Sequence, residues 1–201
     1  MAGPGNGRSA EDHVSVPGRL LSVATRLFAE RGFDRTSVQE IVEAAGVTKG
    51  AMYHYFDSKD DLLYEIYGRI LREQTERLEK LAATEAPVGE RLASAASDVV
   101  VSSIANLDDT KIFLQSMHQL NPEKQRAVRA ERRRYHERFR ALVEEGQRAG
   151  EFRTEQPADL VVDFFFGAVH HLGFWYSPQG AWSAQQVGDH FADLLLNSLR
   201  P

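Results

Sequence analysis

The sequence predicts an all-α protein with an N-terminal three-helix helix-turn-helix domain and a larger C-terminal helical domain, about nine helices in total. Apolar residues recur at intervals of three and four, and no segment alternates apolar and polar residues as a strand does. Turn-forming residues at 84–87, 121–122, 150 and 177–180 separate the periodic segments. We place a tail at residues 1–13 and the two domains at 14–60 and 61–201.

Composition excludes several classes of protein. Cysteine is absent from the 201 residues, which excludes disulfides and thiolate metal sites. The chain has no run of about 18 apolar residues and no N-terminal signal pattern, so we expect a cytoplasmic protein without membrane contact. The net charge of −5 argues against a nucleic-acid partner. That objection is weak, because overall charge does not fix the field on one face.

The first helix is expected after a disordered tail. Residues 1–13 are glycine-rich and polar, which is typical of disorder. Pro17 suits the first turn of a helix and Gly32 its end. Between them, leucine, alanine and phenylalanine at helical spacing form one apolar stripe. This helix should hold the two that follow.

The segment from Thr36 to Lys59 predicts two short helices joined by a tight turn. Ser37 can cap the first helix, and Glu40 completes a capping box. Gly46 stands where a helix ends in the left-handed conformation, and Thr48 can cap the second helix. A glycine turn between two such helices is typical of a helix-turn-helix, whose second helix enters the major groove of DNA. The alternative is an ordinary antiparallel helix pair.

Several side chains of this segment suit contacts with double-stranded DNA. Lys49 can donate to a guanine edge, and Ala51 can touch a thymine methyl group. Thr36 and Ser37 offer hydroxyls and helix-start N–H groups to a phosphate, and Lys59 can do the same from the next helix.

The same region resembles the TetR family of bacterial transcriptional repressors. The resemblance lies in residues 27–33, 36–38, 41, 44–47, 50–56 and 58–63. In that family, the positions matching Thr36, Thr48, Lys49, Gly50, Tyr53, His54 and Lys59 meet DNA, mostly phosphate. Our expected DNA-binding residues are Thr36, Ser37, Thr48, Lys49, Gly50, Ala51, Tyr53, His54, Tyr55 and Lys59.

The remaining helices are expected at residues 58–83, 88–107, 110–120, 122–149, 158–177 and 184–199. The first of them is long enough to join both domains, which makes it the mechanical link. Residues 160–175 are apolar almost all round, and the last helix has one apolar face. Because one subunit cannot cover that much apolar surface, we expect a homodimer that pairs these helices in a four-helix bundle.

A dimer would also present two reading helices to a pseudo-palindromic operator, with half-sites about 34 Å apart. The resemblance implies the same arrangement. The expected interface residues are Phe164, Ala168, Leu172, Trp175, Val187, Phe191, Leu194 and Leu195.

The C-terminal domain carries polar residues among apolar ones. The inner stripe of the 122–149 helix has a gap at Glu131 or Arg132, and His170 and Asp163 stand on an apolar helix. Mostly apolar walls with a few polar groups are typical of ligand pockets. The alternative is a core whose polar groups are satisfied internally. The expected ligand-binding residues are Phe113, Met117, His118, Glu131, Arg132, Tyr135, Phe139, Phe166 and His170.

These features together favour a repressor that a small apolar effector releases from its operator. The arginine-rich 122–149 helix is either a solvated face or a binding site for the phosphates of a coenzyme A thioester. Residues 113–150 and 175–187 look similar to acyl-CoA-responsive members of the family. We expect no cofactor. We also expect no metal site, because His170 and His171 are adjacent on a helix and point about 100° apart.

Two alternatives stay open. One is an all-α enzyme that uses His170 with Asp163 or Glu131, although these residues form no recognisable nucleophile arrangement. The other is a DNA-binding dimer without a ligand, which differs in that no metabolite would change its thermal stability.

Overall fold

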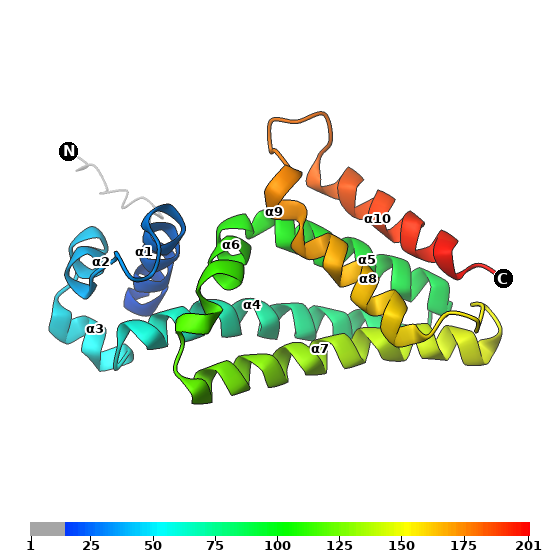
Figure 1. The fold of residues 1–201 in the computed structure, drawn as a ribbon, viewed down its shortest axis with the longest axis horizontal. Helices are drawn as coiled ribbons and strands as arrows, with labels where there is room; N and C mark the ends of the chain where they lie inside the picture. The colour runs from blue at the N-terminus through cyan, green and yellow to red at the C-terminus, as the bar shows by residue number, and fades with distance from the viewer. Residues whose placement is uncertain (1–14) are drawn as a thin grey trace, which may run out of the picture.

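The computed structural model describes residues 15–201, apart from the side chains of Phe113 and Leu114. The expected tail therefore lies outside the described residues. Within them, all regular structure is helical, which confirms the all-α prediction (Figure 1). The helices are α1 (Val16–Arg31), α2 (Val38–Ala44), α3 (Lys49–Tyr55), α4 (Lys59–Ala82), α5 (Val88–Ala105), α6 (Leu107–Ser116), the 3₁₀ turn η1 (Met117–Gln119), α7 (Pro122–Ala149), α8 (Ala158–His170), α9 (Leu172–Trp175) and α10 (Ala184–Leu199).

Helices α1, α2 and α3 form one end of the elongated molecule, which we call the reading head (Figure 1). Ser37 and Glu40 form the expected capping box at the start of α2, and the Thr48 hydroxyl accepts the N–H of Ala51 at 3.1 Å. Gly46 has a φ of 64°, a conformation that glycine adopts without steric cost. Local sequence therefore fixes both the start of each helix and the turn between α2 and α3.

Helix α4 belongs to both parts of the molecule. Its first half, including Leu63 and Tyr67, packs in the core of the reading head, and Leu78 packs in the core of the C-terminal domain. Ile112 of α6 and Val128 of α7 join the head core as well. The packing of the head therefore continues past residue 60 into the C-terminal domain.

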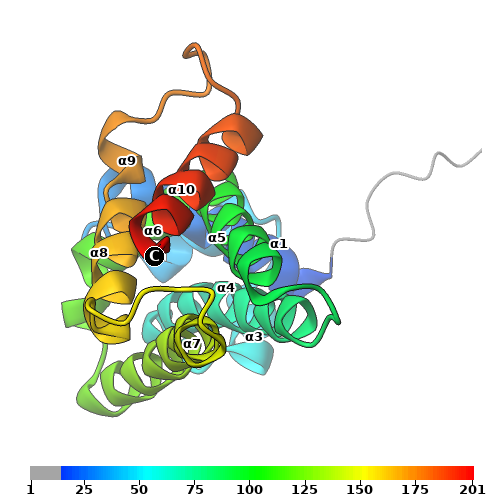
Figure 2. The same ribbon diagram turned by 90° about the vertical axis from the view of Figure 1, so that its right-hand side faces the viewer.

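The C-terminal domain is a helical bundle in which α5 and α10 run against each other (Figure 2). A Cβ on Gly188 of α10 would lie 2.8 Å from the Ser97 Oγ of α5, so close approach depends on this glycine. Phe139 of α7 stacks on Phe165 of α8 with ring centroids 5.2 Å apart. None of the described helices is long and apolar enough to cross a membrane.

One expected helix is divided. The sequence predicts a single helix at 158–177, but α8 ends at His170 and the short α9 follows. The N–H of Tyr176 closes α9 on the carbonyl of Leu172, whose side chain is fully buried. The break buries Leu172 in the core while Phe174 and Trp175 stay at the surface.

Candidate DNA-binding surface and ligand cavity

Helix α3 has a buried face and an exposed face. Met52 is fully buried, and Phe56, one turn later, is buried as well. Lys49 and Tyr53, also one turn apart, lie exposed on another side. Of the other expected DNA contacts, Thr48, Gly50, His54 and Tyr55 are exposed and Ala51 is half-buried. The head thus presents a row of polar and aromatic groups on the helix predicted to read DNA.

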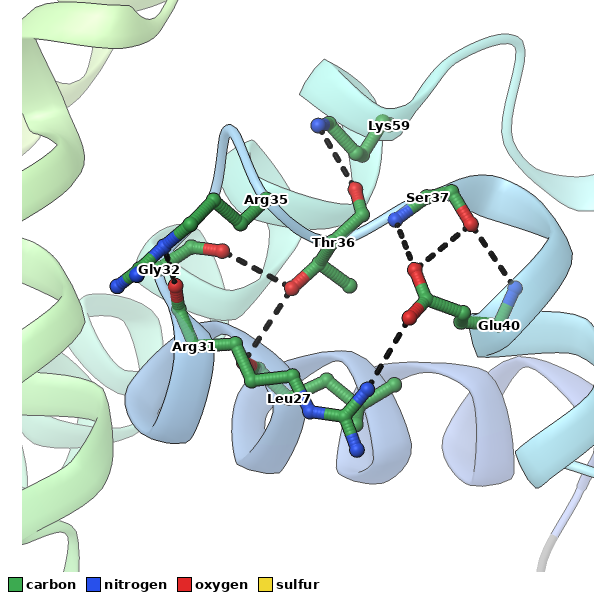
Figure 3. A network of polar contacts seen from close by, with 8 residues as sticks. All are labelled: Leu27, Arg31, Gly32, Arg35, Thr36, Ser37, Glu40 and Lys59. Atoms are coloured by element: carbon green, nitrogen blue, oxygen red, sulfur yellow. Dashed lines mark hydrogen bonds and ion pairs between the residues drawn. The ribbon is translucent and has the colours of Figure 1, made fainter.

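The start of α2 is internally paired (Figure 3). The Ser37 N–H and hydroxyl both donate to Glu40 Oε2 at 2.8 Å, and Arg31 forms an ion pair with the other carboxylate oxygen at 3.1 Å. The Ser37 N–H is the main cause that lowers the pKa of Glu40. Ser37 is exposed, but a DNA phosphate would have to replace this carboxylate as its partner.

Thr36 does not offer its side chain to DNA, which corrects one of our expectations. It is buried, and its hydroxyl lies 2.9 Å from the carbonyl oxygen of Gly32 and 3.3 Å from that of Leu27 (Figure 3). Its N–H donates to the carbonyl of Phe33. A buried hydroxyl needs such partners, so Thr36 holds the α1–α2 loop on α1.

Lys59 is also drawn into the protein. Its ammonium donates to the carbonyls of Phe33 at 2.7 Å and Thr36 at 2.9 Å, and it lies 4.1 Å from the centroid of the Phe33 ring. Partial burial is the main cause that lowers its pKa. Lys59 therefore ties α4 to the α1–α2 loop, and a phosphate contact remains a prediction for its remaining N–H.

Polar contacts join the reading head to the C-terminal domain. Lys124 at the start of α7 forms an ion pair with Asp61 at the start of α4. Gln119 of η1 donates to Asp34 of the α1–α2 loop at 2.7 Å. The Tyr67 hydroxyl donates to the backbone carbonyl of Ile112 in α6. Gln119 of η1 therefore touches the head directly. Through the other two contacts, α6 and the start of α7 meet α4, whose first half packs in the head core.

A cavity of about 80 Å³ lies in the C-terminal domain next to these contacts. Five helices line it, with residues from α4, α5, α6, α7 and α8. They are Tyr67, Ile70, Leu71, Gln74, Val99, Ser103, Asp109, Thr110, Arg132, Tyr135, His136, Phe166, Val169 and His170. Tyr67 belongs both to the lining of this cavity and to the head core.

Burial changes the ionisation of the groups in the cavity. It lowers the pKa of His170 to about 4, with Arg132 as the next cause, and it lowers the pKa of His136 for the same two reasons. It raises the pKa of the Asp109 carboxyl, which the nearby Arg69 opposes. Both imidazoles are therefore neutral at neutral pH, whereas a guanidinium stays charged.

The cavity contains part of the expected ligand-binding set. Arg132, Tyr135, Phe166 and His170 line it, and Arg132 rather than Glu131 faces inward. The other expected residues lie elsewhere. Phe139 stacks on Phe165 in the core of the C-terminal domain, and Met117 packs against the head core. His118 is exposed, and Glu131 lines a separate hollow with residues of α4. The side chain of Phe113 lies outside the described part.

The structure does not bring together the residue pairs of the enzyme alternative, His170 with Asp163 or Glu131. Asp163 is exposed, and neither it nor Glu131 lines the cavity beside His170. Residues 15–201 contain no group of three or more histidine, aspartate or glutamate side chains placed to hold a metal ion.

Apolar side chains are exposed on α8, α9 and α10, where α8 and α10 lie side by side (Figures 1 and 2). Phe164 is 78% exposed and Leu194 69% exposed, and the expected Trp175 is also exposed. Leu160 and Phe174 add to this surface although we did not expect them.

Other expected interface residues are not exposed. Leu172, Val187 and Leu195 are buried in the core, so they cannot supply contact area to a dimer. Ala168 and Phe191 are half-buried.

Comparison with known proteins agrees with this architecture. Residues 20–66 match the profile of bacterial regulatory proteins of the tetR family, and residues 85–199 match that of the tetracycline-repressor-like C-terminal domain. The transcriptional repressor KstR2 of Mycolicibacterium smegmatis is 28% identical over 191 residues, which cover 90% of this chain and 88% of KstR2.

Two solved structures extend the likeness to the whole fold. The TetR family regulator PfmR of Thermus thermophilus is 31% identical with a TM-score of 0.82, covering 91% of this chain and 100% of PfmR. The ketosteroid transcriptional regulator KstR2 of Mycobacterium tuberculosis is 26% identical, also with a TM-score of 0.82, covering 96% and 100%. Because the two profiles together span most of both domains, this chain belongs to the TetR family of bacterial transcriptional regulators.

Proposed function

We propose that this protein is a homodimeric repressor that binds a pseudo-palindromic operator and leaves it when a small, mainly apolar effector enters the cavity. The observation that carries the proposal is the sharing of α4 between the core of the reading head and the wall of the cavity. Relatives across most of the chain include a transcriptional repressor and a ketosteroid regulator.

DNA binding is assigned to the exposed face of α3. The side chains of Lys49 and Tyr53 are exposed to solvent. The buried side chains of Met52 and Phe56 hold the helix in place. Lys49 at the start of α3 suits a guanine edge, and the exposed aromatic rings suit the sugar-phosphate backbone. Ser37 and Lys59 flank this face as phosphate contacts that compete with their internal partners.

Release follows from the size of the cavity. At about 80 Å³ it is smaller than the roughly 300 to 1,000 Å³ of ordinary ligand pockets. An effector must therefore push α4, α7 and α8 apart, and movement of α4 shifts the head through Tyr67 and Asp61. The effector acts only if it binds this widened state more tightly than the closed state.

The residues that line the cavity indicate the chemical class of the effector. Ile70, Leu71, Val99 and Val169 supply apolar contacts, which favours an apolar body. A coenzyme A thioester is one such class. Arg126, Arg129 and Arg133 are exposed on α7, where they are available to the phosphates of such a molecule.

The dimer is assigned to the exposed apolar surface of α8, α9 and α10. A patch that includes Phe164, Phe174 and Leu194 is unusual on a monomer and typical of an association surface. Pairing α8 and α10 with their copies would bury it in a four-helix bundle.

Selection of bound duplexes from a pool of random DNA sequences tests this function and identifies the operator sequence in the same experiment. We expect enrichment of a two-fold symmetric sequence with half-sites about one helical turn, or a multiple of it, apart. The variant Lys49→Ala, which changes an exposed side chain, should fail to enrich it. A pool that stays random with the unchanged protein at low salt would reject the proposal.

A further inference from the structure

We infer that the effector carries an anionic group that binds at Arg132 between the imidazoles of His136 and His170, with its apolar body lying toward α4 and α5. The inference rests on the proposed function, since it specifies the ligand of the same cavity.

The three basic side chains come together from two helices. Arg132 and His136 are one turn apart on α7, and His170 ends α8. His136 stacks on the Phe166 ring with centroids 4.0 Å apart, and the His170 ring lies 6.2 Å from the same phenyl ring. All four line the cavity, so its α7–α8 side holds a guanidinium and two imidazoles around one phenyl ring.

The electrostatics of this side favour an anion. Arg132 has lost water on burial, which lowers its pKa, and its charge also disfavours protonation of both imidazoles. An acidic group placed here receives charge-assisted hydrogen bonds in a region of low dielectric.

The rest of the wall has the opposite character. Ile70 and Leu71 of α4, Val99 of α5 and Val169 of α8 have no polar side-chain atoms. A molecule that satisfies both sides is an amphipath with an apolar body and one acidic end. A free carboxylic acid has this chemistry, and so does a coenzyme A thioester through its phosphates.

Thermal unfolding of the full chain without DNA tests the inference with matched compounds. Hexanoic, octanoic, decanoic and dodecanoic acids are each compared with their methyl esters and their coenzyme A thioesters at neutral pH. We expect the acids or thioesters to bind the unchanged protein about ten- to a hundredfold more tightly than the esters, because a hydrogen bond to a charged group is that strong.

The variants are chosen to separate charge from folding. Arg132→Gln should remove the preference over the esters, and Arg132→Lys should retain part of it. Arg148→Gln, which changes an exposed arginine near the other end of α7, should leave it intact. If Arg132→Gln does not fold, His170→Gln reports on the same anion and should weaken the preference.

Each outcome decides the point. A preference for acids that Arg132→Gln removes indicates a carboxylate. A preference shown by thioesters alone that Arg132→Gln also removes indicates a phosphate. Equal binding of esters and acids, a preference that survives in Arg132→Gln, or no binding by any compound would overturn the inference. DNA selection is performed without these compounds, so the repressor proposal stands or fails independently.

Discussion

Lys59 has two competing roles, a predicted contact with DNA phosphate and an observed structural contact within the protein. From the sequence it is a cation at a helix start near DNA, but the fold turns its ammonium toward two backbone carbonyls and a phenyl ring. These contacts join α4 to the α1–α2 loop. The residue that would touch phosphate is therefore also one that holds the reading head together.

We predict that Lys59→Met destabilises the protein by about 2 kcal/mol, because it removes two hydrogen bonds from a charged donor and leaves the carbonyls of Phe33 and Thr36 without it. Denaturant unfolding measures the loss. Lys49→Met, at an exposed position, is the control and should unfold at the same denaturant concentration as the unchanged protein. Equal stability of both variants would show that the Lys59 contacts contribute little.

The half-buried His170 makes stability depend on pH. Its pKa is about 4 in the folded protein and 6.5 in its ordinary state, so the unfolded chain binds the proton more tightly. Its contribution is fully present above about pH 6.5 and is lost as the pH falls from there toward 4. The loss amounts to about 3 kcal/mol at most, since one pKa unit corresponds to about 1.4 kcal/mol.

His170→Gln should flatten this part of the stability profile, because glutamine does not titrate. Unfolding free energies measured between pH 7 and pH 4 give the slope. His118→Gln, an exposed histidine, should retain the original slope. Parallel profiles for His170→Gln and the unchanged protein would contradict the burial of a neutral imidazole.

At the residue scale, the sequence predicts what depends on near neighbours. The capping of α2 by Ser37 and the turn at Gly46 need only a few adjacent residues, and both are present. The burial of Thr36 depends on the carbonyls of Leu27 in α1 and of Gly32 at its C-cap, nine and four residues away. A hydroxyl at a helix start looks the same in sequence whether it faces DNA or its own loop.

At the scale of elements, α3 is the helix on which sequence reading depends. Lys49 is the long donor at its start, whereas its neighbours Thr48 and Gly50 present short side chains or none. A base-edge contact discriminates between sequences, but a phosphate contact does not. The two roles therefore leave different signatures in a binding experiment.

We predict that Lys49→Ala binds the selected operator about tenfold or more weakly while its affinity for random duplex changes little, because a good base contact is worth roughly 1 to 3 kcal/mol. Fluorescence anisotropy on both duplexes measures this at one salt concentration. Arg19→Ala, an exposed cation of α1, provides the control. Equal weakening on both duplexes would assign Lys49 to phosphate.

Most helix boundaries could be predicted because caps and turn residues mark them. Helix α7 begins after Asn121, whose side chain caps it, and ends at Gly150 in the left-handed conformation. The end of α8 carries no such mark, because neither glycine nor proline stands at His170 or His171. That break depends on the burial of Leu172 against other helices, which local sequence does not encode.

At the scale of the whole molecule, the surplus of apolar residues on the last helices is visible in both sequence and structure. The sequence predicts too much apolar surface for one subunit, and the fold leaves Phe164 and Leu194 exposed. The sequence could not predict which of these apolar side chains stay exposed, because the packing of α5 on α10 decides that Val187 and Leu195 are buried.

We predict that Phe164→Glu combined with Leu194→Glu yields a folded monomer that binds the operator at least tenfold more weakly, since two charges would be buried in the interface. Sedimentation gives the mass, and circular dichroism checks the fold. Thr154→Glu, in the exposed loop before α8, adds charge elsewhere and should remain dimeric. A double variant that stays dimeric would place the interface on another surface.

The cavity is likewise a property of the whole molecule. Tyr135 could be predicted from the inner apolar stripe of α7, and the gap in that stripe indicated Glu131 or Arg132 without deciding between them. Gln74, Ser103 and Asp109 could not be predicted, because on α4, α5 and α6 they look like ordinary polar positions. Only the convergence of five helices makes them neighbours.

We propose that occupation of this cavity controls the affinity of α3 for DNA. The most direct measurement is the affinity for the selected operator duplex, read by fluorescence anisotropy with and without the decanoic acid, ester and thioester set. We predict that a compound that raises thermal stability in the absence of DNA also weakens operator binding, and that Arg132→Gln binds the operator but no longer responds. Tight operator binding that no stabilising compound changes would contradict control of DNA binding by this cavity.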